Sequence, residues 1–195
     1  MKNKNIISPE NSILIVIDVQ EKLLPTILDH KITAENISKL IRGCKVHNVP
    51  IIYTEQYKKG LGETVEVVSK ELSGIEPIEK MEFSCFQNDE FKDKLKEYKD
   101  VKNLIICGIE AHVCVLQTSL DAIEDGYNVH IVKDAISSRK AYDYNTGIEK
   151  MKMCGVFPTT VEIALFELTN TSKSPEFKEI SKIVKEFTQE KKIGF

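Results

Sequence analysis

Short runs of apolar residues alternate along the chain with longer segments in which apolar residues recur every three or four positions. The runs are rich in β-branched residues and lie at 12–18, 51–54, 103–108 and 129–132. A short, largely unbroken apolar run is typical of a strand that is buried on both faces of a sheet. The pattern therefore predicts strands at these positions.

The segments between the strands carry apolar stripes with helical spacing. Residues that end helices follow two of these segments, at 48–50 (Asn-Val-Pro) and at 125–126 (Asp-Gly). Further helices are expected at 88–98, 142–153 and 161–168. The stripes are formed by Ile37, Leu40, Ile41 and Cys44, by Val113, Leu116, Leu120 and Ile123, and in a last amphipathic helix by Phe177, Ile180, Ile183, Val184 and Phe187.

Strands that alternate with helices of this length indicate right-handed βαβ units. The expected fold is α/β, a three-layer α-β-α arrangement around a parallel, Rossmann-like sheet of about five or six strands. No linker, repeat or low-complexity segment divides the sequence, so residues 1–195 are expected to form a single domain.

Composition narrows the class of protein. The 27 Lys and Arg residues are interspersed among 30 Asp and Glu residues, so no basic face for nucleic acid is expected. The apolar run at 13–17 is far shorter than the ~20 residues that cross a bilayer, and the first residues do not resemble a signal peptide. Five cysteines without paired spacing favour free thiols. These features predict a soluble cytoplasmic protein without a membrane partner.

Candidate chemistry follows the predicted strands. Ligands of an open parallel sheet bind outside the carboxyl ends of its strands. Asp18, Glu55 and Gln56 follow the first two strands, and Asp134 follows the strand at 129–132. The segment 108–114 (Gly-Ile-Glu-Ala-His-Val-Cys) follows the strand at 103–108. These residues are expected to share one edge of the sheet.

Cys114 is the candidate nucleophile at this edge. It lies where the next helix is expected to begin, and a helix N-terminus lowers the pKa of a thiol. The alternative is an ordinary buried cysteine, although the apolar stripe of that helix is complete without Cys114. Lys80 stands in a polar segment, where a solvated surface lysine is the ordinary reading.

Five segments, in order from about residue 12 to residue 168, resemble the signatures of the isochorismatase-like cysteine hydrolase family. The segments are Asp18-Val-Gln20, Lys80 with Ser84 and Phe86, the loop 108–114, the segment 134–139 (Asp-Ala-Ile-Ser-Ser-Arg), and Met151 and Gly155 with 159–162 (Thr-Thr-Val-Glu). The stretch 53–57 (Tyr-Thr-Glu-Gln-Tyr) with Gly60 and Gly62 is most similar to the isochorismatase domain-containing subgroup.

The resemblance implies a catalytic triad of Asp18, Lys80 and Cys114, in which Asp18 takes the thiol proton and Lys80 holds the geometry by its charge. It also implies a non-proline cis peptide at Ile109–Glu110, and an oxyanion hole made by the backbone N–H groups of Glu110 and Cys114. The implied reaction is hydrolysis of a small amide-like or related acyl substrate through a thioester. Candidates for the substrate pocket are Gln20, Glu55, Gln56, Tyr57, Phe86 and His112.

Two departures from the family pattern refine this expectation. Nicotinamidases of the family carry an Asp-x-His metal motif after the second strand, where this chain has Glu55-Gln56-Tyr57. The four histidines show no ligand spacing, so neither a metal nor a cofactor is expected. Isochorismatases that cleave a vinyl ether lack the cysteine, so Cys114 favours amidase-like chemistry.

The sequence fits two other classes of function to different degrees. A nucleotide-binding fold is disfavoured because the only candidate glycine motif, Gly60-x-Gly62, lacks the third glycine and follows the second strand. A binding or scaffold protein that keeps the fold without turnover stays open as the alternative. Apolar residues late in the chain, together with the oligomerisation usual among members of the family that the chain resembles, predict a homo-oligomer. The expected partner is a small-molecule substrate.

Overall fold

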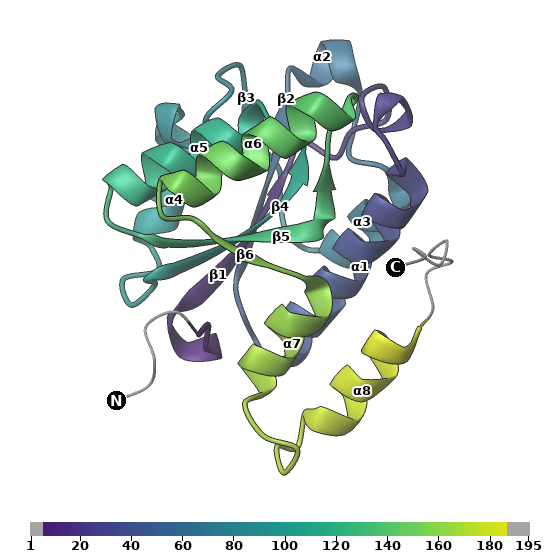
Figure 1. The fold of residues 1–195 in the computed structure, drawn as a ribbon, viewed down its shortest axis with the longest axis vertical. Helices are drawn as coiled ribbons and strands as arrows, with labels where there is room; N and C mark the ends of the chain where they lie inside the picture. Colours follow the sequence, from purple (N-terminus) through teal and green to yellow (C-terminus); the bar gives the residue numbers. More distant parts are fainter. Residues whose placement is uncertain (1–5, 187–195) are drawn as a thin grey trace.

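The computed structural model describes residues 6–186 of the chain, in which six parallel strands form one sheet (Figure 1). The strand order is β3-β2-β1-β4-β5-β6, so the chain builds one half of the sheet outward from β1 and the other half outward from β4. The bounds are β1 Ser12–Ile17, β2 Ile51–Gln56, β3 Ile78–Lys80, β4 Asn103–Ile109, β5 Asn128–Ser137 and β6 Phe157–Thr159.

The two central strands form the middle of the core. Every residue of β1 and of β4 is buried, as their apolar sequences predict. The strands pair in register from Ser12 opposite Asn103 to Ile17 opposite Gly108. This pairing brings the residues that follow both strands to the same edge of the sheet.

Helices cover both faces of the sheet, which gives the expected three-layer α/β fold. Helices α1, α3, α7 and α8 lie on one face, and α5 and α6 lie on the other with α4 beside them (Figure 1). The bounds are α1 His30–Val46, α2 Lys58–Leu61, α3 Glu66–Ser69, α4 Asp89–Lys96, α5 Cys114–Glu124, α6 Ala141–Met153, α7 Val161–Thr169 and α8 Phe177–Lys185.

The strand expected at 129–132 extends further than predicted. β5 continues past Val132 to Ser137, with a register shift against β4 between Ile106 and Gly108. Asp134 is therefore inside a strand rather than at its carboxyl end, and its carboxylate accepts a hydrogen bond of 2.9 Å from the N–H of Val161. Because the register shift lets the charged residues Lys133 and Asp134 lie inside β5, a search for continuous apolar runs does not detect the full strand.

The expected core stripe of α5 is also wrong. The residues buried on this helix are Cys114, Val115, Thr118, Ser119 and Ala122, whereas Leu116 and Leu120 are half-buried. Small and polar side chains therefore make up most of the buried part of this helix, and Leu116 and Ile123 pack against the core while only partly buried. Cys114 belongs to the buried stripe and does not stand outside it.

Helix α8 packs its apolar face against the chain itself. It contacts α1 and α7, and Ile180 and Ile183 are buried there. These residues therefore do not provide the free apolar surface from which a homo-oligomer was expected. Phe187, the last residue of the expected stripe, lies outside the described residues.

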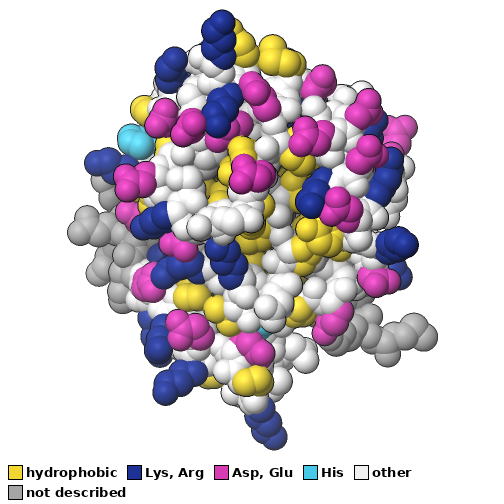
Figure 2. All heavy atoms as spheres, turned by 180° about the vertical axis from the view of Figure 1, so that it is seen from behind, with side chains coloured by type: hydrophobic (Ala, Val, Ile, Leu, Met, Phe, Trp, Pro, Cys, Tyr) yellow, Lys and Arg dark blue, Asp and Glu magenta, His cyan; other side chains and the backbone are white. Residues whose placement is uncertain are grey.

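Charge is spread evenly over the surface that Figure 2 shows. Basic and acidic side chains alternate on this face, and no patch of one sign dominates it. None of the helices in residues 6–186 has the length and apolar character needed to cross a membrane.

Candidate active site

The candidate site lies where the order of the strands reverses, between β1 and β4. Asp18 follows β1, and the loop after β4 leads to Cys114, the first residue of α5. Asp18 has a φ of 53°, the left-handed conformation that Asp adopts more readily than most residues. Reversals of this kind are where open α/β sheets bind ligands.

Gly108 allows the two strands to approach closely at this point. Its φ is 116°, and a Cβ atom there would lie 2.1 Å from the carbonyl oxygen of Ile17. Only glycine fits this position, because any other residue would collide with the backbone of β1 directly before Asp18.

Lys80 and Asp18 form a buried ion pair. Nζ of Lys80 lies 2.6 Å from Oδ2 of Asp18, and both side chains are fully buried. Burial lowers the pKa of Lys80, but the charge and hydrogen bond of Asp18 together with the nearby thiols of Cys85 and Cys114 outweigh it, so the pKa is raised. Lys80 is therefore an ammonium ion inside the protein, and the reading of a solvated surface lysine is wrong.

Further buried groups complete the coordination of the pair. Oγ1 of Thr54 donates a hydrogen bond of 2.7 Å to Oδ1 of Asp18. Nζ of Lys80 donates to Oε1 of Gln56 at 2.8 Å, and to the carbonyl oxygens of Glu82 and Phe83 at 3.2 and 3.4 Å. The pair is thus held by β2 on one side and by the turn after β3 on the other.

The thiol of Cys114 hydrogen-bonds with the carboxylate of Asp18 and interacts electrostatically with Lys80. Burial raises the pKa of the thiol strongly, and the charge of Asp18 raises it further, while Lys80 lowers it. The pKa of this thiol is therefore raised by desolvation and by the adjacent carboxylate, whereas the start of a helix was expected to lower it. The resting thiol is protonated.

The loop between β4 and α5 has the predicted cis peptide bond at Ile109–Glu110. The side chain of Glu110 points away to Arg139, whose N–H and Nε donate to its carboxylate at 2.9 and 3.1 Å. Nδ1 of His112 lies 2.9 Å from Oγ of Ser138. The side chains of Glu110 and His112 are therefore engaged by the segment after β5.

Gln20 and Glu55 hold the loop that follows β2. The amide of Gln20 donates to the carbonyl oxygens of Gln56 and Gly62 at 3.0 and 2.7 Å. Oε1 of Glu55 accepts hydrogen bonds from the N–H and the hydroxyl of Thr64 at 2.7 and 2.9 Å. Both side chains organise the wall of the site through this loop.

The two aromatic pocket candidates differ in position. Tyr57 is 46% exposed beside the carboxyl end of β2. Phe86 is buried and packs against Phe91 and Tyr127, with ring centroids 5.5 and 5.9 Å apart. Their roles toward a substrate stay predictions.

Cys85 is a second thiol near the pair that the sequence did not single out. It is fully buried in the turn after β3, and its backbone N–H donates 3.0 Å to Oγ1 of Thr118 on α5. Burial raises its pKa to about 11, although Lys80 interacts with it. Cys44 and Cys107 are buried, whereas Cys154 is exposed at the end of α6.

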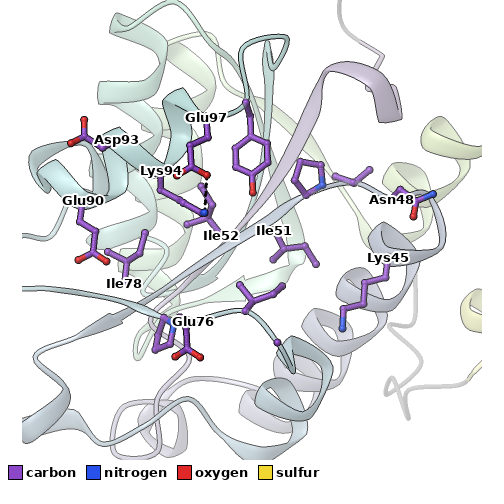
Figure 3. A pocket seen from close by; sticks show the side chains of 16 residues that line it. Lys45, Asn48, Ile51, Ile52, Glu76, Ile78, Glu90, Asp93, Lys94 and Glu97 are labelled. Carbon is purple, nitrogen blue, oxygen red and sulfur yellow. Dashed lines mark hydrogen bonds and ion pairs between the residues drawn. The ribbon is translucent and has the colours of Figure 1, made fainter.

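A hollow of about 1060 Å³ lies at the other end of the sheet (Figure 3). Its floor includes Ile51, Ile52 and Ile78, and charged side chains such as Lys94 and Glu97 surround it. None of the triad residues lines it. The candidate site lies elsewhere, because nucleophilic catalysis needs a nucleophile and a base in contact.

Residues 6–186 contain no group of three or more His, Cys, Asp or Glu side chains arranged to hold a metal ion. The expectation of metal-free chemistry stays a prediction.

Comparison with known proteins decides the family. The Isochorismatase domain matches residues 12–163. This chain belongs to the isochorismatase domain family. The expected resemblance is confirmed, and the six-stranded parallel sheet agrees with solved structures of the same fold.

Relatives of this family match over most of the chain. Isochorismatase domain-containing protein 2 of Danio rerio is 39% identical and covers 91% of this chain and 89% of its own length. The secreted isochorismatase effector Isc1 of Phytophthora sojae is also 39% identical, over 91% of this chain and 86% of that protein. A solved structure, the MAR1 ribonuclease of Caenorhabditis elegans, has a TM-score of 0.86 at 39% identity and covers 92% of both chains.

Proposed function

We propose that this isochorismatase-family protein is a cysteine hydrolase that cleaves a small amide-like (C–N) or related acyl substrate through a thioester on Cys114. The observation that carries the proposal is the buried contact between a thiol, a carboxylate and an ammonium ion. Asp18 hydrogen-bonds with Cys114 and lies 2.6 Å from Lys80. A nucleophile, its base and a group that orients the base are the constellation of nucleophilic catalysis.

The charges at the site define how the thiol is activated. Lys80 neutralises one negative charge, so the carboxylate of Asp18 and a thiolate on Cys114 are not favoured together in a buried site. The proton instead moves from Sγ to Asp18 as the sulfur attacks, and the net charge of the three groups does not change. A buried thiol with a raised pKa is therefore compatible with nucleophilic attack.

The reaction proceeds in two balanced steps. Sγ of Cys114 bonds to the carbonyl carbon, Asp18 takes the thiol proton, and the carbon–nitrogen bond breaks as Asp18 returns that proton to the leaving amine. A water molecule then attacks the thioester with Asp18 as base, which releases the acid and restores the thiol.

The backbone before α5 supplies the proposed oxyanion hole. Helix α5 has no side-chain cap at its N-terminus, and the N–H of its first residue has no partner within the helix. We assign the N–H groups of Glu110 and Cys114 to the developing oxyanion, which preorganised donors stabilise in a site that excludes water.

The remaining parts of the proposal concern partners and place. We propose that the reaction needs no cofactor or metal, that the protein acts in the cytoplasm, and that it assembles as a homo-oligomer without nucleic-acid or membrane partners. The exposed apolar side chains of Ile163 and Phe166 on α7, beside Ile6, support self-association.

Intact-mass spectrometry tests the proposed function. We expect one of a panel of small amides, ureas, carbamates and esters to add an acyl group to the wild-type protein and to be hydrolysed in the presence of a chelator. Cys114→Ala should abolish both the adduct and turnover while circular dichroism stays unchanged. A short RNA belongs in the panel because of the name of the nematode relative. Turnover that persists in Cys114→Ala would overturn the proposal.

The alternative is a binding or scaffold protein without turnover. The observation in its favour is the enclosure of the site, because Cys114 is only 6% exposed and its thiol is protonated at rest. On this alternative, wild type and Cys114→Ala would bind the same compounds with equal affinity, and no panel member would acylate the protein.

A further inference from the structure

Two residues of β2 each contact one member of the Asp18–Lys80 ion pair. Thr54 and Gln56 are two positions apart in the strand, so their side chains project from the same face. The hydroxyl of Thr54 reaches Asp18 at 2.7 Å, and the amide oxygen of Gln56 reaches the ammonium of Lys80 at 2.8 Å. Both residues are buried, so water does not substitute for either contact.

Thr54 acts on the charged form of Asp18. Its hydroxyl is the donor, and Oδ1 of the carboxylate is the acceptor. With Lys80 on Oδ2 and the thiol of Cys114 also bonded, the carboxylate has three donors. A hydrogen bond to a carboxylate stabilises its ionised form and makes it a weaker proton acceptor.

Gln56 is held in one orientation by two unlike partners. Its Oε1 accepts a hydrogen bond from Lys80, and its Nε2 donates a hydrogen bond of 2.7 Å to the carbonyl oxygen of Met81. A glutamate at this position would turn one oxygen toward that carbonyl oxygen, where two acceptors repel each other. An amide at this position therefore fixes the ammonium without adding a negative charge.

We propose that Thr54 and Gln56 are positioning residues that set how strongly Asp18 holds the proton of Cys114. The inference rests on the proposed function, since it concerns the same triad. Thr54 weakens the basicity of the Asp18 carboxylate. Gln56 holds Lys80 beside Asp18, and Lys80 is the one charged side chain of β2 and β3 that contacts this carboxylate. Together they place the shared proton on sulfur at rest and allow its transfer during attack.

The titratable groups around the thiol are few. Asp18 comes from the end of β1, Lys80 from β3, and Cys85 from the turn after β3. Glu110 and His112, from the loop after β4, are engaged with Arg139 and Ser138 and lie 4.0 Å from each other. Thr54 contacts both Asp18 and the thiol of Cys85. The Asp18→Asn variant, which keeps Cys85, therefore shows whether a shift in the pH profile of Cys114 passes through Asp18.

The sign of the effect follows from the contact. Thr54→Val keeps the shape of the side chain and removes the donor, so Asp18 becomes a stronger proton acceptor. At low pH, a second proton occupies the Asp18–Cys114 unit and the thiol no longer reacts. The acid limb of Cys114 alkylation should therefore move to higher pH, by about one unit for the loss of one charged hydrogen bond.

The experiment measures the alkylation rate of Cys114 by iodoacetamide from pH 4 to 9, with peptide mass mapping. We expect the limb to shift upward in Thr54→Val and to return to within a few tenths of a unit, ~0.3, in Thr54→Ser, which restores the hydroxyl. The matched control is Thr159→Val on β6, at the far edge of the sheet, where the hydroxyl donates to a backbone carbonyl. Its profile should equal that of wild type.

Gln56→Glu gives an independent arm that does not depend on the folding of Thr54→Val. An added carboxylate beside Lys80 should also move the limb to higher pH. A limb that stays in place in a folded Thr54→Val protein, or in Gln56→Glu if Thr54→Val does not fold, overturns the positioning role. The Asp18→Asn variant distinguishes failure of the positioning role from failure of the proposed function. If the wild-type limb persists in Asp18→Asn, the triad itself is wrong.

Discussion

Nζ of Lys80 lies 2.6 Å from Oδ2 of Asp18, and neither side chain is exposed to solvent. Such a pair is a unit, since each charge is tolerated in the interior only while the other is present. Two hydrogen bonds from β2 and two backbone carbonyl groups complete the unit.

The first prediction concerns this pair. Asp18→Asn leaves the ammonium of Lys80 without its counter-charge, and the loss of one partner of a buried pair costs about 3–5 kcal/mol of unfolding free energy. Lys80→Met should be destabilising for the same reason. The double variant should lose much less than the sum of the two, because no isolated charge remains. Urea denaturation of the four proteins measures this, and additive losses would contradict a coupled pair.

The second prediction concerns the close approach of β4 to β1. Gly108→Ala places a methyl group 2.1 Å from the carbonyl oxygen of Ile17 and requires a φ of 116° of a residue with a side chain. We expect a loss of at least about 2 kcal/mol, from overpacking and backbone strain together. Gly126→Ala is the matched control. It also has positive φ, but nothing lies within 4 Å of its added Cβ. Equal losses in the two variants would show that steric contact with β1 is unimportant.

The third prediction concerns pH and stability. His130 is buried in β5, stacked on Phe157 at 5.3 Å between centroids, and its Nε2 has no hydrogen-bond partner among the described residues. Burial lowers its pKa to about 4, below the value of ~6.5 that it takes in the unfolded chain.

The unfolded state therefore binds a proton at His130 more readily than the folded state does. The unfolding free energy that depends on a neutral His130 is fully present above pH ~6.5 and is lost as the pH falls toward 4. The loss amounts to about 3 kcal/mol. His130→Leu should remove this part of the pH dependence, as measured by denaturation at pH 7, 5.5 and 4. An identical slope in wild type and variant would contradict the assignment.

The fourth prediction concerns assembly. Ile163 and Phe166 are exposed on α7, next to Ile6, and we expect this face to join copies of the chain. Light scattering at micromolar concentration should give a multiple of the 22.2 kDa chain mass. Ile163→Glu should reduce that mass, while a charge placed at exposed Leu28, on another surface, should not. A monomeric wild type would contradict the prediction of a homo-oligomer.

The sequence predicts the parts of this fold that are apolar and continuous. The buried strands β1 and β4 and the stripe on α1 have the spacing that burial requires, so they could be recognised. The three-residue strands β3 and β6 were not, because Ile78-Glu79-Lys80 and Phe157-Pro158-Thr159 are too short to show a period.

The site was predicted less completely, for a physical reason. Asp18 and Cys114 stand beside strong elements, but Lys80 became a candidate only through the family resemblance. Its burial depends on Asp18, which is 62 residues away in the chain. The contact of Thr54 with Asp18 has the same character. Long-range polar partners leave no local pattern, whereas apolar partners leave a periodic one.

The exposed position of Cys154 has a practical consequence. Cys154 and Cys114 belong to the same molecule, but the thiol of Cys154 is exposed to solvent and the thiol of Cys114 is buried against Asp18. Cys154 therefore works as an internal reference, whose reaction reports the strength of the reagent and its dependence on pH in a particular buffer. The ratio of the two modified peptides cancels errors of dose and time, and it converts a single digest into a relative rate constant for the enclosed sulfur.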